Sequence, residues 1–255
     1  TQSGENTARY INGHFYDGNL SEDATYETRV LRYTERTLNS LQFHGKHHLP
    51  GLFKSNIDWN YSYSKNEQDE PDMRFFSNHF YVDEEDGDTS YYIAPNLYTL
   101  PQRYYRELDE DNNSFDLNLT IPFKQWNGQA SKLKFGGLFS QKDRDFIEKV
   151  YNFKNPANNY NYDGDPDEFF SPENMGIVDS TFNPYSQSWR YTWTMYVYDN
   201  SDPRANYAGN EDISAFYGMV DMPLSSKLRA IAGARFETTD IEVAPIDTSY
   251  ESGSI

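Results

Sequence analysis

The chain has 255 residues, no cysteine and a formal net charge of −18, from 22 Lys and Arg against 40 Asp and Glu. Without cysteine there is neither a disulfide framework nor thiolate chemistry, and the acidic balance argues against nucleic acid as a partner. The mean hydropathy is −0.90, and no run approaches the roughly 18 apolar residues of a transmembrane helix, which excludes a helical membrane protein. Aromatic residues make up 17% of the chain, which suits either the girdles of a membrane β-barrel or a sugar-binding β-protein.

The first clear strand signal follows weaker candidates at residues 9–16 and 26–34. An incoming arm carries Leu41 and Phe43, a turn is predicted at residues 49–51, and a return arm alternates apolar with polar side chains. The apolar positions of the return arm are Phe53, Ile57, Trp59, Tyr61 and Tyr63. A period of two is typical of a strand with unlike faces, so these residues predict a β-hairpin.

Three histidines, His44, His47 and His48, lie beside this turn. Imidazole is a common metal ligand, but on a strand His44 and His48 point one way and His47 the other. Three ligands do not converge from that geometry, so polar lining is favoured over a metal site. Residues 62–65 fit a Ser-x-x-Lys pattern without its companion motifs. We predict no enzyme activity, because no other catalytic arrangement is found.

A second pair of arms is predicted at residues 115–121 and 133–139, around a polar connection at 124–131. Two long segments, 65–112 and 147–209, are predicted to be loops. Short helices are compatible with these regions, for example at residues 143–151, where the apolar spacing is helical. Acidic runs fall at residues 83–88 and 107–111. Solvated loops are the usual setting of such runs.

The segment 189–198 in the second loop alternates as a strand, with one face formed by Trp189, Tyr191, Trp193, Met195 and Val197. Structural packing is one interpretation of this face. An aromatic platform that stacks a ligand is the other. The residues of the first loop expected to join it are Tyr91, Tyr92, Tyr98, Tyr104 and Tyr105.

Three aspartates, Asp163, Asp165 and Asp167, alternate in the second loop. Oxygen ligands at this spacing suit calcium, but the twelve-residue pattern with its central Gly and final Glu is missing. An unliganded acidic loop is therefore the default interpretation, with calcium as a weak candidate.

The strongest pattern occupies residues 207–239, two arms joined by a polar turn at 223–226. Each arm has about 12 residues, slightly more than the roughly 9 to 11 that a tilted strand needs to cross a bilayer. In the first arm one face carries Ile213, Ala215, Tyr217 and Met219. In the second arm the apolar side chains are Leu228, Ala230, Ala232, Ala234 and Phe236, and they oppose a charged face. An apolar face beside a charged one fits a wall between lipid and water, so Arg229, Arg235 and Glu237 are predicted to face the lumen.

A sequence signature runs along this hairpin, formed by Tyr207, Glu211, Ile213 and Ala215, then Gly233, Arg235 and Glu237. It resembles the later barrel strands of TonB-dependent outer-membrane receptors, which often read Tyr-x-Ala-x-Glu-x-Ile-x-Ala, a short turn, and Gly-x-Arg-x-Glu. Residues 43–62 and 134–146 are similar to the same family, so the resemblance covers most of residues 36–241.

The resemblance implies an all-β fold, an antiparallel up-and-down transmembrane β-barrel segment with long extracellular loops and short periplasmic turns. Residues 1–255 are expected to form one partial barrel domain, without a plug domain or a closing strand. The implied function is TonB-dependent uptake of a siderophore, vitamin or oligosaccharide through the bacterial outer membrane. Implied partners are outer-membrane lipid, the remaining barrel and plug polypeptide, the TonB energy-coupling system, and a small-molecule or glycan ligand. We predict no cofactor and no nucleic-acid partner.

A second hypothesis is a water-soluble all-β carbohydrate-binding surface module, which also accounts for the aromatic residues and the low hydropathy. The two hypotheses are separated by the apolar face of Phe53, Ile57, Trp59, Tyr61 and Tyr63. A soluble module buries this face against a second sheet, whereas a receptor exposes it to lipid.

Overall fold

The computed structural model describes residues 1–12, 24–93, 99–154, 162–225 and 227–246. Most of these residues belong to antiparallel strands. The strands are β1 (Gln2–Asn12), β2 (Thr25–Leu49), β3 (Ser55–Val82), β4 (Thr89–Tyr92), β5 (Gln102–Lys124), β6 (Ala130–Lys154), β7 (Ile177–Asn183), β8 (Ser188–Trp193), β9 (Tyr196–Asp199), β10 (Tyr207–Pro223) and β11 (Arg229–Pro245). Helical structure in the described ranges comprises α1 (Pro166–Phe169) and the 3-10 turns Pro172–Asn174 and Pro203–Ala205.

The main sheet has nine strands in the order β1-β2-β3-β5-β6-β10-β11, with β4 beside β3 and β9 beside β6. A separate two-stranded sheet pairs β7 with β8. The prediction of an all-β antiparallel fold is confirmed. Because β1 and β11 end the strand order, the described strands form an open sheet, and barrel closure stays a prediction.

The chain divides into two compact units, which are described one at a time. We call Arg36–Gln68, Leu108–Ile147 and Asn206–Ile255 the belt unit, and Thr1–Glu35, Asp69–Glu107 and Glu148–Ala205 the core unit. Four strands, β2, β3, β5 and β6, contribute residues to both units.

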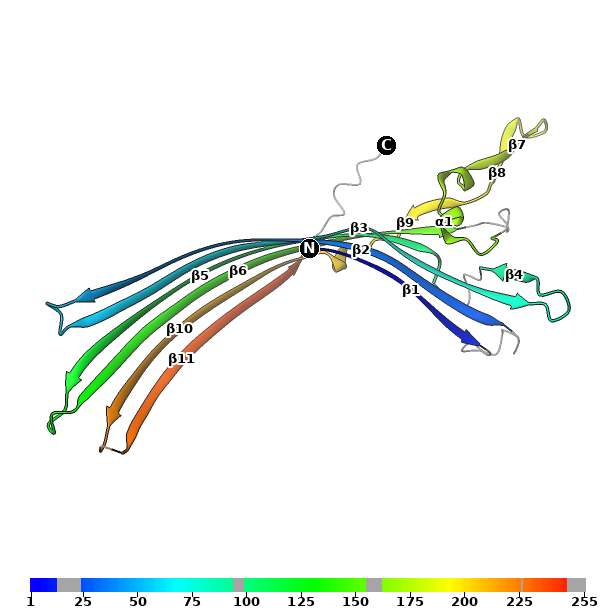
Figure 1. Cartoon of the computed structure of the whole chain (residues 1–255). Helices are drawn as coiled ribbons and strands as arrows, with labels where there is room; N and C mark the ends of the chain where they lie inside the picture. Colours follow the sequence, from blue (N-terminus) through cyan, green and yellow to red (C-terminus); the bar gives the residue numbers. More distant parts are fainter. Residues whose placement is uncertain (13–23, 94–98, 155–161, 226, 247–255) are drawn as a thin grey trace. The chain divides into compact units, whose positions relative to one another are not determined.

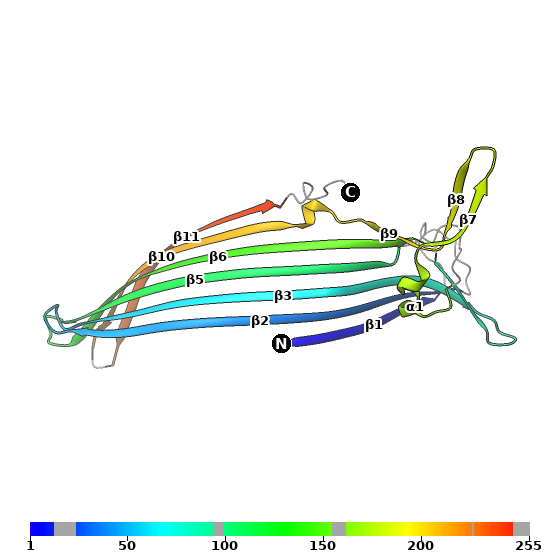
Figure 2. The same ribbon diagram turned by 90° about the horizontal axis from the view of Figure 1, so that it is seen from above.

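The belt unit consists of three hairpins whose strands lie side by side, β2 with β3, β5 with β6, and β10 with β11 (Figure 1 and Figure 2). Their connections are short, and each joins two strands within a few residues. Tyr207 pairs with Phe146 on β6 and with Pro245 on β11, so β10 joins the second and third hairpins. The three predicted hairpins are confirmed, with one local correction. Phe53 lies in the first turn at a φ of 52° and is not part of the apolar strand face.

The strands extend far beyond the predicted arms. The segments 65–112 and 147–209 are not loops throughout, because β3 continues to Val82, β5 begins at Gln102 and β6 continues to Lys154. The acidic run at residues 107–111 therefore lies on β5, where cross-strand pairs stabilise it. The short helix considered at residues 143–151 is not formed, since this stretch lies in the second half of β6 and pairs in part with β10.

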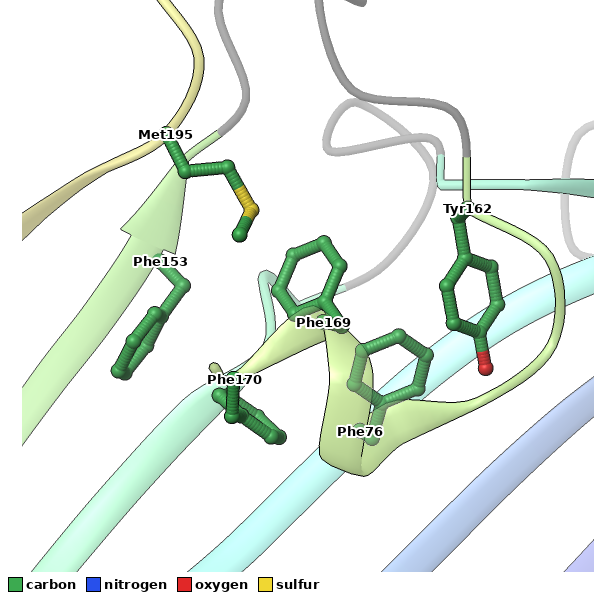
Figure 3. Packing of buried hydrophobic residues seen from close by; sticks show 6 residues of the cluster. All are labelled: Phe76, Phe153, Tyr162, Phe169, Phe170 and Met195. Carbon is green, nitrogen blue, oxygen red and sulfur yellow. The ribbon is translucent and has the colours of Figure 1, made fainter. Parts of the chain in front are cut away.

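The core unit buries an aromatic cluster formed by Phe76, Phe153, Tyr162, Phe169, Phe170 and Met195. Figure 3 shows the ring of Phe76 beside those of Tyr162, Phe169 and Phe170, with centroids 4.9, 5.0 and 5.7 Å away. Two of these contacts are edge-on, a favoured geometry of aromatic pairs, and the contact with Tyr162 is tilted. The short helix α1 brings Phe169 into the cluster, and Asp165 caps this helix by accepting from the Asp167 N–H.

The strand predicted at residues 189–198 is divided in two. β8 ends at Trp193, and β9 begins at Tyr196 and pairs with β6 instead. Between them Met195 is fully buried in the aromatic cluster, and its carbonyl accepts the Gly176 N–H at 3.0 Å. Met195 and Val197 therefore do not continue the face that carries Trp189.

Candidate functional site

One face of the belt unit carries a continuous band of apolar side chains, which we call the apolar belt. Strand register places Phe216 of β10 opposite Gly137 on β6 and Phe236 on β11. On β3 and β5, the hydrogen bond from Tyr61 Oη to Asn113 Oδ1, 3.1 Å, puts the odd-numbered side chains on one face. The belt consists of Leu41, Phe43, Ile57, Trp59, Tyr61, Phe115, Leu117, Leu119, Ile121, Phe123, Leu133, Phe135, Phe139, Phe216, Val220, Met222, Ala230, Ala232, Ala234 and Phe236.

The apolar belt is uncovered in the described part of the belt unit, whose strands form a single sheet. Phe216 is 53% exposed and Phe236 is 72% exposed. Exposed apolar patches much larger than a few hundred Å² mark contact with another apolar phase or with a partner. The soluble hypothesis expects a second sheet over Ile57, Trp59 and Tyr61, and the described residues of this unit contain no such sheet.

A row of carboxylates, which we call the rim, borders the apolar belt on the same face, at the end of the belt away from the short turns. The rim consists of Glu67, Asp109, Asp111, Asp143, Asp145, Asp212, Asp240 and Glu242, and Lys65 pairs with Glu67 at 2.6 Å. At the border, Tyr63 Oη donates to Asp111 Oδ1 at 2.6 Å. An ionised carboxylate is costly in hydrocarbon, so the rim marks where an apolar surrounding phase must end.

The height of the apolar belt agrees with that of a membrane-facing band. On β5 the belt runs from Phe115 to Phe123, about 26 Å along the strand at roughly 3.3 Å per residue. At a tilt of about 40° this is roughly 20 Å of height, comparable to the band of about 25 Å on outer-membrane barrels. Phe115, Phe139 and Phe216 stand next to the rim, where such barrels carry aromatic girdles.

The opposite face of the belt unit is polar and cross-linked by hydrogen bonds. Tyr217 Oη donates to Asn118 Oδ1 at 2.7 Å, passing over Gly136. A Cβ at Gly136 would lie 2.3 Å from Tyr217 Cε1, so only glycine leaves room for this bond. Further along the same face Lys142 Nζ lies 3.4 Å from Glu211 Oε2. We call this surface the polar face.

The predicted lumen-facing residues all lie on the polar face. Arg229 Nε donates to Asp221 Oδ1 at 2.5 Å, and Arg235 Nε donates to Glu237 Oε2 at 2.9 Å. Register pairs Tyr217 with Arg235. The face of Ile213, Ala215, Tyr217 and Met219 is therefore the charged one, and the apolar side of β10 is instead the side of Phe216 and Val220.

The predicted aromatic platform is found in the core unit only in part. On β7 and β8, Trp189, Tyr191 and Trp193 share one face with Phe182 and Ile177, and each is roughly half exposed. Phe182 packs on Trp189 with centroids 5.3 Å apart. Sequence reasoning identified the β8 residues but missed Phe182 and Ile177, because only the pairing of β7 with β8 brings them there.

Tyr104 and Tyr105, two further proposed platform residues, belong to an ion-pair network on β5 of the core unit. The Arg106 guanidinium lies 4.8 Å from the ring of Tyr104, and its Nε donates to Glu148 Oε2 at 2.6 Å. Tyr105 packs against Tyr151, with centroids 5.8 Å apart. These contacts give both tyrosines a structural role. Tyr98 lies outside the described residues.

A second set of charges in this network surrounds Asp72. Arg103 Nε donates to Asp72 Oδ1 at 2.7 Å, and Arg74 Nε donates to Asp72 Oδ2 at 2.9 Å. Burial alone would raise the pKa of Asp72, but the two guanidinium groups outweigh it and lower that pKa below its usual value. Asp72 is therefore held ionised between two arginines.

The candidate metal ligands are engaged in other contacts. Asp163 Oδ1 accepts the Asp165 N–H, Asp165 caps α1, and Asp167 pairs with Arg74 at 2.6 Å. His47 Nε2 accepts from Trp59 Nε1 at 3.0 Å. His48 Nδ1 lies 2.9 Å from Asn56 Oδ1. Over the described ranges, no three His, Asp or Glu side chains are grouped so as to hold a metal ion.

Neither the models of protein families nor the curated proteins match this chain. None of the helices in the described residues is long and apolar enough to cross a membrane.

Proposed function

We propose that this chain is part of the wall of an outer-membrane β-barrel of the TonB-dependent receptor type, which takes up a scarce nutrient. The observation that carries the proposal is the uncovered apolar belt, backed by a polar face and bordered by a carboxylate rim. A lipid-facing wall requires this division, because side chains alternate between hydrocarbon and water along each strand.

The proposal assigns a surrounding to each surface. Outer-membrane lipid covers the apolar belt, and the polar face, including Arg229, Arg235 and Glu237, lines an aqueous lumen. The free edges of β11 and of β2 at residues 36–49, beyond its pairing with β1, pair with the remaining barrel strands, since open sheet edges do not persist in a bilayer. A plug polypeptide and the TonB energy-coupling system are the expected partners, and no residue described here performs energy coupling.

The ligand is a siderophore, a vitamin or an oligosaccharide. The exposed strip of Trp189, Tyr191 and Trp193 supports an oligosaccharide, because sugar rings stack on aromatic faces. The same strip also favours a second candidate function, a soluble carbohydrate-binding surface module. That alternative leaves the apolar belt without a covering layer.

Detergent dependence tests the proposal. The chain is purified from membranes with whatever accompanies it, detergent is removed, and β-structure and particle size are followed by circular dichroism and light scattering. The receptor proposal expects loss of solubility and additional polypeptide alongside the chain. A monodisperse folded monomer in plain buffer would overturn it and favour the soluble module.

A further inference from the structure

Positive charge gathers at the turn end of the polar face, against the trend of an acidic chain. Lys46 on β2, Lys132 and Lys134 on β6, and Arg229 on β11 lie near the three short turns. Register pairs Lys132 with Asp221 and Lys134 with Met219 on β10, which places both lysines on the polar face. The chain as a whole carries a net charge of −18, so this excess of cations is local.

The three lysines of this group line a cavity that spans four strands. The cavity has a volume of about 400 Å³ and is lined by Lys46, His47, His48, Asn56, Asp58, Thr120, Lys132 and Lys134. This volume lies within the roughly 300–1,000 Å³ range of small-molecule sites. The lining offers ammonium, hydroxyl and amide donors, and Asp58 is its one carboxylate.

Carboxylates of the protein neutralise these lysines only in part. Lys46 Nζ lies 3.7 Å from Asp58, a weak and exposed pair. Asp221 acts electrostatically on Lys132 and Lys134 but is held by two hydrogen bonds from Arg229. No hydrogen bond or ion pair to Lys132 or Lys134 is found within the described ranges. Three lysines against one aspartate leave the cavity with two uncompensated positive charges.

We propose that this cavity binds a multivalent oxyanion, a phosphate or polycarboxylate group of a small solute. Lys132 and Lys134 are two residues apart on one strand face, about 7 Å along the strand. Two ammonium groups at that spacing can contact different oxygens of one anion, and Thr120 supplies a hydroxyl donor. Repulsion by distant carboxylates is screened over a Debye length of about 8 Å, so the local charges control binding.

This inference goes beyond the proposed function and does not require it. The test uses the full chain in detergent micelles at an ionic strength of about 0.15 M, where this screening holds, with inorganic phosphate and citrate as probes in isothermal titration calorimetry. Saturable binding of at least one probe is expected, and phosphate binding without citrate binding, or the reverse, identifies the source of the oxyanion. Absence of heat with both probes would overturn the proposal.

Matched variants separate the cavity from the overall charge. The double variant Lys132→Gln/Lys134→Gln should weaken the affinity at least about tenfold. Lys124→Gln/Lys227→Gln makes the same charge change outside the cavity and should alter affinity less than twofold. Lys132→Arg/Lys134→Arg keeps both charges and should retain binding. Equal losses in the two glutamine variants would show unspecific attraction and overturn the proposal.

Discussion

The two units of this protein handle apolar side chains in opposite ways. In the core unit Phe169 is 1% exposed, enclosed by other aromatic residues of the same unit. In the belt unit Phe236 is 72% exposed, although it lies in the middle of the regular strand β11, which has 17 residues. The core unit supplies its own apolar surroundings, whereas the belt unit presents a surface for surroundings that it does not contain.

The comparison extends to the charges. In the core unit, Asp72 is partly buried and accepts hydrogen bonds from both Arg74 and Arg103. The belt unit separates its ion pairs from its apolar residues by the alternation of the strand, so that Arg235 and Phe236 are neighbours in sequence and lie on opposite faces. The core unit thus encloses its apolar side chains in a packed cluster, whereas the belt unit keeps apolar and charged side chains apart on opposite faces of its strands.

The largest expected effect comes from breaking the aromatic cluster. Phe169→Ala should destabilise the core unit by about 3–5 kcal/mol, because it leaves a cavity among closely packed rings. The belt unit should keep its structure. Hydrogen exchange resolved by segment measures both, with increased exchange expected on the core-unit parts of β3 and β6 and unchanged exchange on β10 and β11.

Phe182→Ala provides the control for this variant. Phe182 is an aromatic residue of the same unit but is 45% exposed, and its removal should cost well under half as much. If Phe169→Ala instead loosened both units equally, the division into a self-packed unit and an externally packed unit would fail.

A charge placed on the apolar belt tests whether the exposed face of the belt unit contacts lipid. Leu117→Arg introduces a cation near the middle of the belt on β5, which costs about 2–4 kcal/mol at the midplane of a bilayer. Ser114→Arg puts the same residue on the polar face of the same strand and should cost far less. Urea unfolding in lipid vesicles, followed by tryptophan fluorescence, measures the difference. Equal destabilisation by the two variants would contradict a lipid-facing belt.

The third-largest effect is expected at Gly233, where β11 closely approaches the backbone of β10. A Cβ at Gly233 would lie 2.6 Å from Met219 Cβ and 2.7 Å from the Gly218 carbonyl oxygen, so Gly233→Ala must move the β10–β11 pair. The expected cost is about 1–3 kcal/mol. Gly209→Ala on β10 is the control, because its nearest neighbours are 3.9 Å away. The same urea experiment should show a lower midpoint for the Gly233 variant alone.

Sequence pattern predicted the hairpins because each signal is local. Alternating side chains and polar turns within about 30 residues identify all three pairs of the belt unit. The strand extensions carry no such signal. On β5 the residues 107–111 are charged on both faces, and the groups that stabilise them, Tyr63 and Arg144, are 48 and 34 residues away. A short stretch of sequence around residues 107–111 does not include these partners, so the strand could not be predicted from local pattern.

The candidate sites show the same limit. Both faces of β10 contain apolar residues, so only its register with β11 shows that Tyr217 accompanies Arg235. The aromatic cluster joins Phe76, Phe153 and Phe169 from segments far apart in the chain, and no motif marks them. Exposed aromatic residues on β8 were predictable from alternation, whereas the burial of Met195 depends on the pairing of Gly176.

The smallest effect concerns the charge on Asp72 in the core unit. Its pKa is lowered in the folded state, so the pair with Arg103 and Arg74 contributes stability that is fully present above the unfolded value of 3.8 and is lost as pH falls through the folded value. The contribution should be about 0.2–1 kcal/mol, because the carboxylate is partly exposed. Segment-resolved hydrogen exchange between pH 5 and pH 3 should show this loss in the core unit, and Asp72→Asn should reduce the pH dependence. A pH dependence of the same size in the variant would assign the acid sensitivity to other carboxylates and remove this charge from the features that distinguish the two units.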